Sequence, residues 1–270
     1  MRVAAVQLHS TPDRDRNHET AAVLIARAAG EGARLVALPE LFGFLGRGTE
    51  LAAGAEPLDG PTVAWARQLA TTHDVWLLAG SFVERDGDHL YNTSCLVGPT
   101  GELVATYRKI HLFDVEVPGT GGHESDLYTA GTTPVNATVD GIGVGLTICY
   151  DLRFPELYRI LTLRGASVLA VPSAFTAATG RDHWELLVRA RAVENQVYVL
   201  APDQCGTSAD GTPRHGHSLV VDPWGRVLAD AGEGEGLAIA DVDPAELTRV
   251  RELLPSLANR RPQAYRWPAP

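Results

Sequence analysis

Short apolar runs alternate along the chain with segments in which apolar residues recur every three or four positions. Continuous apolar runs predict strands that are buried on both faces of a sheet. These runs lie at residues 3–8, 35–38, 75–82, 94–97, 103–107, 142–148, 168–171, 197–200, 219–221, 227–229 and 237–240.

Helical periodicity is clearest in four segments. Pro61 and Pro155 stand where the first turn of a helix tolerates proline, Gly165 follows the end of the third segment, and Asp182 is a candidate cap for the fourth. The predicted helices cover residues 17–29, 61–71, 155–164 and 182–196. Strands and helices that alternate in this way indicate an α/β fold.

The two halves of the chain resemble each other. Three matches occur in the same order, each half reading strand, helix, strand, helix and then three strands. They join residues 32–39 to 165–172, 75–79 to 197–201, and 94–105 to 218–229. Two such halves can bury their sheets against each other, which predicts a four-layer α–β–β–α sandwich in a single domain over residues 1–270. The alternative is chance recurrence of a Gly-Ala-x-apolar-Pro pattern.

Composition narrows the range of functions. The 33 acidic residues outnumber 23 Lys and Arg, leaving a net charge of −10, which argues against DNA or RNA as a partner. The three cysteines, Cys95, Cys149 and Cys205, form no CxxC pair, so neither a disulfide framework nor a zinc ribbon is expected. The apolar start of the chain is too short for a signal or membrane segment, which predicts a cytoplasmic protein.

Cys149 is the first candidate for chemistry. It follows the predicted strand 142–148 and precedes the helix that Pro155 begins, so it lies at the carboxyl edge of a sheet, where sites form in α/β proteins. Turn amides there can lower the pKa of a thiol and bind an oxyanion. The alternative is a buried, inert cysteine, which suits Cys95 and Cys205 better.

Two charged residues also follow predicted strands. Glu40, in Leu-Pro-Glu, stands beside apolar groups that should raise its pKa, as a general base requires; the alternative is a surface glutamate. Lys109, in YRKIHLFD, could stabilise an oxyanion or protonate a leaving amine; the alternative is a solvated turn.

Taken together, the motifs LPE, YRKIHLFD and ICYDLRFPE resemble the Glu–Lys–Cys motifs of the nitrilase superfamily of carbon–nitrogen hydrolases. Their order and spacing fit that family, and the similarity runs over nearly the whole chain. The resemblance implies that Cys149 is the nucleophile, Glu40 the general base, and Lys109 the group that stabilises the tetrahedral intermediate. It also implies an α–β–β–α fold, homodimers or larger assemblies, and no cofactor or metal.

Two further roles follow from the resemblance. Glu124 would be the second glutamate, which positions the lysine and the substrate amide, although Glu116 lies in the same loop. The backbone N–H of Tyr150 would share the oxyanion with Lys109. The nucleophile would form a thioester that water then hydrolyses.

The motifs most resemble the branch of ω-amidases and deaminated glutathione amidases, which implies a 2-oxo acid amide as substrate. Such a substrate carries a carboxylate, so a cation is expected in the pocket, from Arg153 or from Arg181. Arg153 could instead form a structural ion pair with Glu156. Phe175 and Thr176 are expected to line the pocket, or else to serve in ordinary packing.

Several alternatives share some of these features. An N-carbamoyl amino acid hydrolase and an aliphatic amidase would use the same three residues, and a catalytically silent binding protein would keep the fold. His215 and His217 could be a metal pair, but no HExxH motif or cysteine pair completes a site. Gly216–Val220 lacks the last glycine of the serine-hydrolase GxSxG motif.

Overall fold

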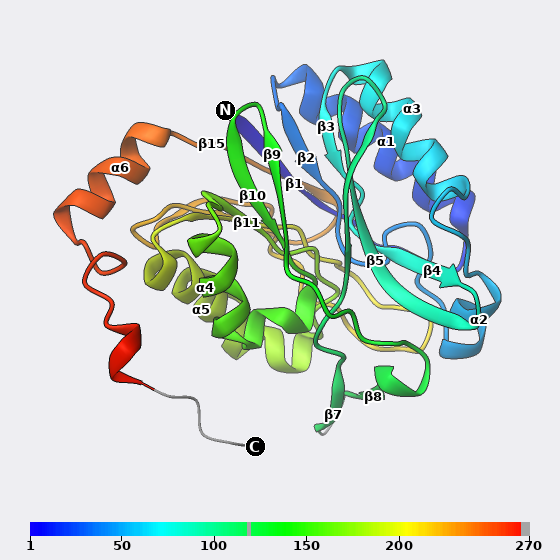
Figure 1. Cartoon of the computed structure of the whole chain (residues 1–270). Coiled ribbons are helices and arrows are strands. Elements are labelled where there is room, and N and C mark those ends of the chain that lie inside the picture. The colour runs from blue at the N-terminus through cyan, green and yellow to red at the C-terminus, as the bar shows by residue number, and fades with distance from the viewer. Residues whose placement is uncertain (118–119, 266–270) are drawn as a thin grey trace.

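The computed structural model describes residues 1–117 and 120–265, and its centre is a pair of β-sheets packed face to face (Figure 1). The first sheet has, in spatial order, β15 (Gly236–Asp241), β1 (Arg2–Gln7), β2 (Leu35–Ala37), β3 (Trp76–Leu78), β5 (His89–Val97) and β4 (Phe82–Asp86), with β6 (Leu103–Arg108) also paired to β5.

The second sheet repeats this arrangement. Its order is β14 (Val227–Asp230), β13 (Leu219–Val221), β12 (Tyr198–Ala201), β11 (Val168–Ala170), β10 (Ile142–Leu146) and β9 (Val135–Val139). In each sheet three parallel strands are followed by antiparallel ones, and β15 pairs with β1 as β9 pairs with β10. The strands of the matched segments occupy equivalent places, so the predicted internal repeat is confirmed.

Helices cover the outer face of each sheet. The helices α1 (Arg14–Gly30) and α3 (Pro61–His73) pack on the first sheet, and α4 (Pro155–Leu163) and α5 (Ala177–Asn195) pack on the second (Figure 1). The predicted α–β–β–α sandwich is therefore confirmed.

Strand β1 is buried on both faces of the first sheet. Val3 and Ala5 join the core between the sheets, whereas Ala4 and Val6 join the core beneath α1 and α3. Because successive side chains of a strand point to opposite faces, only a strand that is apolar at every position suits a sheet covered on both sides.

Several predicted boundaries were wrong. The run 75–82 is two strands, because Gly80 has a φ of +41° between β3 and β4. Helix α5 begins at Ala177, after Thr176, so Asp182 lies inside the helix and does not cap it. The predicted loop 115–136 contains most of β7 (Asp114–Val117), β8 (Thr120–His123) and the start of β9.

Two helices were not predicted. Helix α2 (Gly48–Ala53) buries only Leu51, and α6 (Pro244–Leu253) buries only Leu247 and Val250. So few buried positions leave a weak periodic signal in the sequence.

Gly80 provides a test of how the fold holds the segment before Glu40. A Cβ at residue 80 would lie 1.9 Å from the carbonyl oxygen of Pro39, and the positive φ disfavours other side chains. We expect Gly80→Ala to lower the free energy of unfolding by about 1–3 kcal/mol, measured by chemical denaturation. Gly30→Ala is the control, because nothing lies within 4 Å of its added Cβ. Equal stability of the two variants would contradict this account.

Candidate active site

Cys149 lies on a strained turn three residues beyond the end of β10 (Ile142–Leu146). Its φ of +46° is unusual for a residue with a side chain, and its N–H donates to the carbonyl of Pro172 at 2.8 Å. Such strain is common where a turn must present a functional group. The turn continues as a 3₁₀ helix, Cys149–Arg153, which leads into α4.

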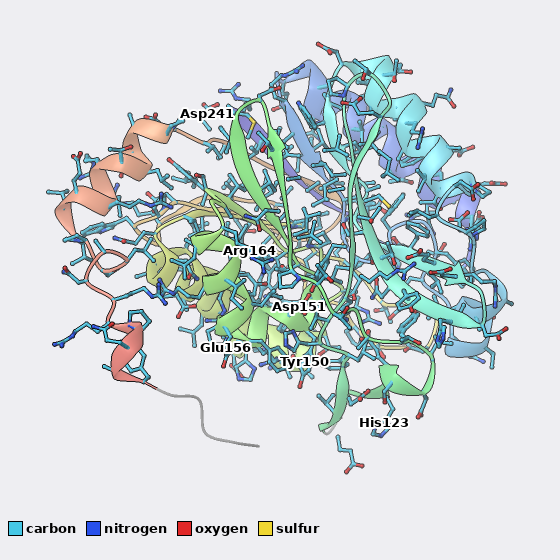
Figure 2. The ribbon with its side chains drawn as sticks, viewed as in Figure 1. His123, Tyr150, Asp151, Glu156, Arg164 and Asp241 are labelled. Carbon is cyan, nitrogen blue, oxygen red and sulfur yellow. The ribbon has the colours of Figure 1, made fainter. Side chains whose placement is uncertain are left out.

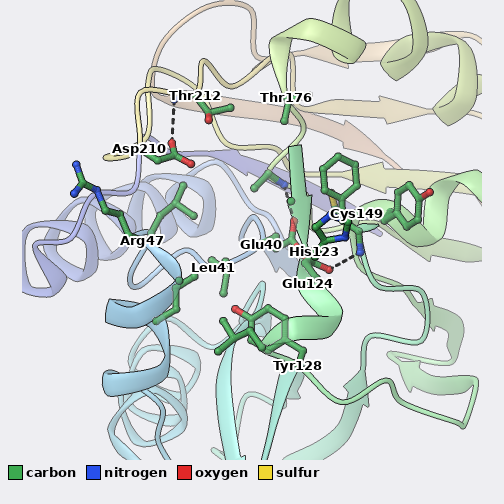
Figure 3. Close-up of a pocket in the computed structure, with 18 of the residues that line it drawn as sticks. Glu40, Leu41, Arg47, His123, Glu124, Tyr128, Cys149, Thr176, Asp210 and Thr212 are labelled. Carbon is green, nitrogen blue, oxygen red and sulfur yellow. Dashed lines mark hydrogen bonds between the residues drawn. The ribbon is translucent and has the colours of Figure 1, made fainter. Parts of the chain in front are cut away.

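The three side chains of the predicted triad meet near the strand ends, and Figure 3 shows two of them, Glu40 and Cys149, beside Glu124 at the cavity. Lys109, directly after β6, donates from Nζ to Glu40 Oε1 at 2.9 Å. Cys149 lines the same cavity as Glu40, and each affects the other's pKa. The structure therefore brings the predicted cysteine, glutamate and lysine together beside the cavity.

The second predicted glutamate also lies at the lysine. Lys109 Nζ is 2.9 Å from Glu124 Oε2, while the backbone N–H of Phe113 donates to the same oxygen at 2.8 Å. The alternative, Glu116, is exposed on β7. Lys109 is only 1% exposed, so its ammonium is enclosed by the two carboxylates.

Glu40 is held on both carboxylate oxygens. Oε1 also accepts from Asn92 Nδ2 at 2.8 Å, and Oε2 accepts from the backbone N–H of Ala174 at 3.0 Å. Burial pushes the pKa of Glu40 up, but the Lys109 ammonium and the hydrogen bonds with Cys149 and Asn92 outweigh burial and leave the pKa below its ordinary value. The predicted raised pKa of Glu40 was therefore wrong, because its apolar sequence neighbours gave no sign of the cation.

The pKa values of Cys149, Glu124 and Lys109 are raised, whereas that of Glu40 is lowered. Burial, with the Glu40 charge, raises the pKa of Cys149 well above the ordinary thiol value, while Lys109 partly offsets this. Burial also raises the pKa of Glu124. Burial opposes charge on Lys109, yet the carboxylates of Glu124 and Glu40 raise its pKa well above the usual range. The thiol is therefore protonated and Glu40 ionised at neutral pH.

Asp151, which the sequence analysis did not single out, ties the cysteine turn to the lysine segment. Its buried carboxylate accepts from the Tyr107 hydroxyl at 2.7 Å, from the backbone N–H of Ile148 at 2.8 Å and from that of His111 at 3.1 Å. The only sequence signal for Asp151 was its position within the ICYDLRFPE motif. Its hydrogen-bond partners could be identified only from the tertiary structure. Within residues 1–117 and 120–265, the neighbouring N–H of Tyr150 has no acceptor, which leaves it available to an oxyanion.

A cavity of about 620 Å³ extends from these groups. Tyr150, Arg153, Phe175 and Thr176 all line it, as predicted. Arg181 does not line the cavity, whereas two arginines that were not predicted, Arg47 and Arg214, do. Asp210 and Thr212 also line it.

The expected alternative for Arg153 was wrong. No ion pair joins Arg153 to Glu156 in the described part of the chain. Glu156 lies in the first turn of α4, and Figure 2 labels it there. The Arg153 guanidinium instead lies 5.3 Å from the centre of the Phe175 ring, and its Nη1 is 3.4 Å from His183 Nδ1. It is thereby held against the cavity wall.

His215 and His217 do not form part of a metal site among the described residues. His217 Nδ1 lies 3.0 Å from Asp230 Oδ2, and no group of three or more His, Cys, Asp or Glu among the described residues is arranged to hold a metal. None of the helices described is long and apolar enough to traverse a bilayer.

The family model described as carbon–nitrogen hydrolase matches residues 2–252. The chain belongs to the carbon–nitrogen hydrolase family. The resemblance to the nitrilase superfamily and the prediction of an enzyme that hydrolyses amides are thus confirmed. The family's fold agrees as well: the crystal structure of Saccharomyces cerevisiae Nit3, a member of branch 10 of the nitrilase superfamily, superposes with a TM-score of 0.88 at 35% identity, over 98% of this chain and 97% of that one.

Two curated members of the family are similar over nearly their full length. A deaminated glutathione amidase from Synechocystis is 46% identical over 95% of this chain and 97% of its own. The mouse ω-amidase NIT2 is 39% identical over 98% of this chain and 96% of its own.

Replacing Lys109 tests the charge balance of the site. In Lys109→Met the buried carboxylate of Glu40 and the partly exposed carboxylate of Glu124 lose their cation, which should cost about 3–5 kcal/mol of stability near neutral pH. Burial then raises the pKa of Glu40 as well as that of Glu124, so this variant should gain stability as pH falls and the carboxylates bind protons. In the natural protein the pH dependence is the opposite. The lowered pKa of Glu40 contributes stability at neutral pH, and this stability is lost as pH falls and Glu40 binds a proton.

Denaturation of both proteins between about pH 5 and 8 measures the difference. The stability gap should be widest at the alkaline end and narrow toward acid. A gap that does not change with pH would show that the lost lysine matters only through packing.

Proposed function

We propose that this enzyme hydrolyses the amide of a 2-oxo acid through a thioester on Cys149. The observation that carries the proposal is the enclosed arrangement at one end of the cavity: a thiol beside an ionised Glu40, whose carboxylate shares the Lys109 ammonium with Glu124. A nucleophile, a base and a fixed positive charge are the groups that amide hydrolysis requires.

In the first half-reaction Glu40 takes the proton of the Cys149 thiol as sulfur attacks the amide carbon. The carbonyl oxygen gains negative charge, which the N–H of Tyr150 and the Lys109 ammonium stabilise. Glu40 then gives its proton to the nitrogen as the C–N bond breaks, so a neutral amine or ammonia leaves and the acyl group stays on sulfur. Glu124 is a positioning residue that fixes Lys109 and the substrate amide.

The second half-reaction reuses Glu40. Water loses a proton to Glu40 as its oxygen attacks the thioester carbon, and the C–S bond then breaks. The proton returns to sulfur, which restores the thiol. Since the free-enzyme thiol has a raised pKa, attack depends on the lowered pKa of Glu40 keeping that base ionised.

The arginines that line the cavity and the similar relatives support an acid amide as substrate. The two relatives named above are a deaminated glutathione amidase and an ω-amidase. We infer that the acyl carboxylate binds at Arg153, with Phe175 and Thr176 forming the wall around the acyl chain. An N-carbamoyl amino acid or a simple aliphatic amide would meet the same reacting groups, so these remain the alternative substrates.

We further propose a single domain over residues 1–270, acting in the cytoplasm as a homodimer. An apolar set on the outer faces of α4 and α5 supports the dimer, because it is exposed in one copy; its members are Ile160, Leu163, Leu186 and Val193.

Cys149→Ala should abolish turnover, a loss of at least about 10⁴-fold, because no acyl-enzyme can form. Cys205→Ala is the matched control: Cys205 is buried but lies outside the cavity lining, so its activity should stay near that of the natural protein. Product release is measured for 2-oxoglutaramate, deaminated glutathione, N-carbamoyl amino acids and simple amides.

Mass spectrometry of the quenched enzyme should find the acyl group on Cys149 alone. Undiminished release of product by Cys149→Ala would overturn the mechanism. Turnover of only the carbamoyl compounds or simple amides would overturn the choice of substrate and leave the mechanism intact.

A further inference from the structure

Three arginines line the cavity, and they differ in what holds them. Arg214 donates from Nη1 to the carbonyl of Ala174 at 2.7 Å and from Nε to Ser208 Oγ at 3.0 Å, so it supports the wall. Arg153 lies against Phe175, on the turn that carries Cys149. The third, Arg47, has an exposed side chain.

Arg47 is the N-cap residue of α2, and its backbone N–H helps to cap the helix. Its N–H donates to Glu50 Oε2 at 2.7 Å, and the guanidinium forms neither an ion pair nor a hydrogen bond with any residue that the structure describes. The nearby acid in the cavity, Asp210, accepts from the N–H of Thr212 at 2.9 Å. Arg47 thus presents an uncommitted cation to the cavity.

Arg47 and the nucleophile Cys149 lie at different ends of the site. Figure 3 shows Arg47 and Cys149 on opposite sides of the cavity, with Glu40 between them. Arg153 belongs to the same 3₁₀ turn as Cys149, whereas Arg47 belongs to the segment that follows Glu40. The leaving nitrogen must point toward Glu40 to receive its proton, so the amine half of the substrate extends toward Arg47.

Between Glu40 and Arg47 the wall is largely apolar. Leu41, Leu45 and Leu51 line it and pack together in one cluster. A cavity of about 620 Å³ exceeds what a five-carbon primary amide fills, and lies in the range for larger ligands. A primary amide, which releases ammonia, would leave this half of the site empty.

We propose that Arg47 binds a carboxylate on the amine half of the substrate and so selects substituted amides over primary ones. This inference rests on the proposed function. The ligand class is an amide with two acid ends: the acyl carboxylate at Arg153, and a carboxylate-bearing amine, such as a short peptide, reaching Arg47. Arginine suits this task because its planar guanidinium can bind a carboxylate through two hydrogen bonds.

The test compares two substrates that share an acyl group. Deaminated glutathione carries a cysteinylglycine amine with a terminal carboxylate, whereas 2-oxoglutaramate carries only ammonia. We expect Arg47→Gln to lower kcat/KM for deaminated glutathione, relative to that for 2-oxoglutaramate, by about 10- to 100-fold, the effect of one hydrogen bond between charged groups. Arg181→Gln is the matched control, since Arg181 is exposed and does not line the cavity, and it should leave this ratio unchanged.

A modified substrate isolates the charge contact. Deaminated glutathione with its terminal carboxylate converted to a carboxamide should lose the same factor with the natural enzyme. Arg47→Gln should treat the carboxylate and the carboxamide alike, because the contact is already gone. This double comparison separates a direct contact from a change in the shape of α2.

The outcomes are distinct. A selective loss that disappears with the carboxamide supports the inference. An equal loss on both amides would make Arg47 a structural residue, and no loss would place the second carboxylate elsewhere; either result overturns the inference. If the natural enzyme cleaves neither amide, the proposed function itself fails.

Discussion

The buried ammonium of Lys109 is the interaction on which the site depends. Two carboxylates, those of Glu40 and Glu124, lie within 3.0 Å of it, and the lysine is almost completely enclosed. Without the cation, burial would favour the neutral acid at Glu40, which is only 3% exposed. The lysine therefore fixes both the position and the protonation state of the base.

That arrangement produces a useful asymmetry between Cys149 and Glu40. Burial keeps the proton on sulfur, while Lys109 and the hydrogen bond from Asn92 keep the Glu40 carboxylate ionised. The free enzyme thus holds an unreactive thiol beside a ready base. The proton moves only when a substrate carbonyl accepts the electron pair of sulfur, so the base need not have a raised pKa.

Duplication of the fold explains why such groups can meet. Each sheet contributes parallel strands whose carboxyl ends open at the same edge, and the sheets pack face to face. Glu40 follows β2 of the first sheet, and Cys149 follows β10 of the second. The active site is therefore built at the junction of the two repeats, with the Asp151 carboxylate linking the cysteine turn to the segment after β6.

The sequence by itself determined the alternation of strands and helices, the repeat and the three motifs, because each depends only on residues that are close together in the chain. It could not determine the pKa of Glu40, the partners of Asp151 or the exposure of Arg47, since these depend on residues distant in the chain. It also missed α2, whose single buried residue gives little periodicity, yet this helix brings Arg47 to the cavity. Electrostatic environment and cavity shape are properties of packing, and only the tertiary structure decides them.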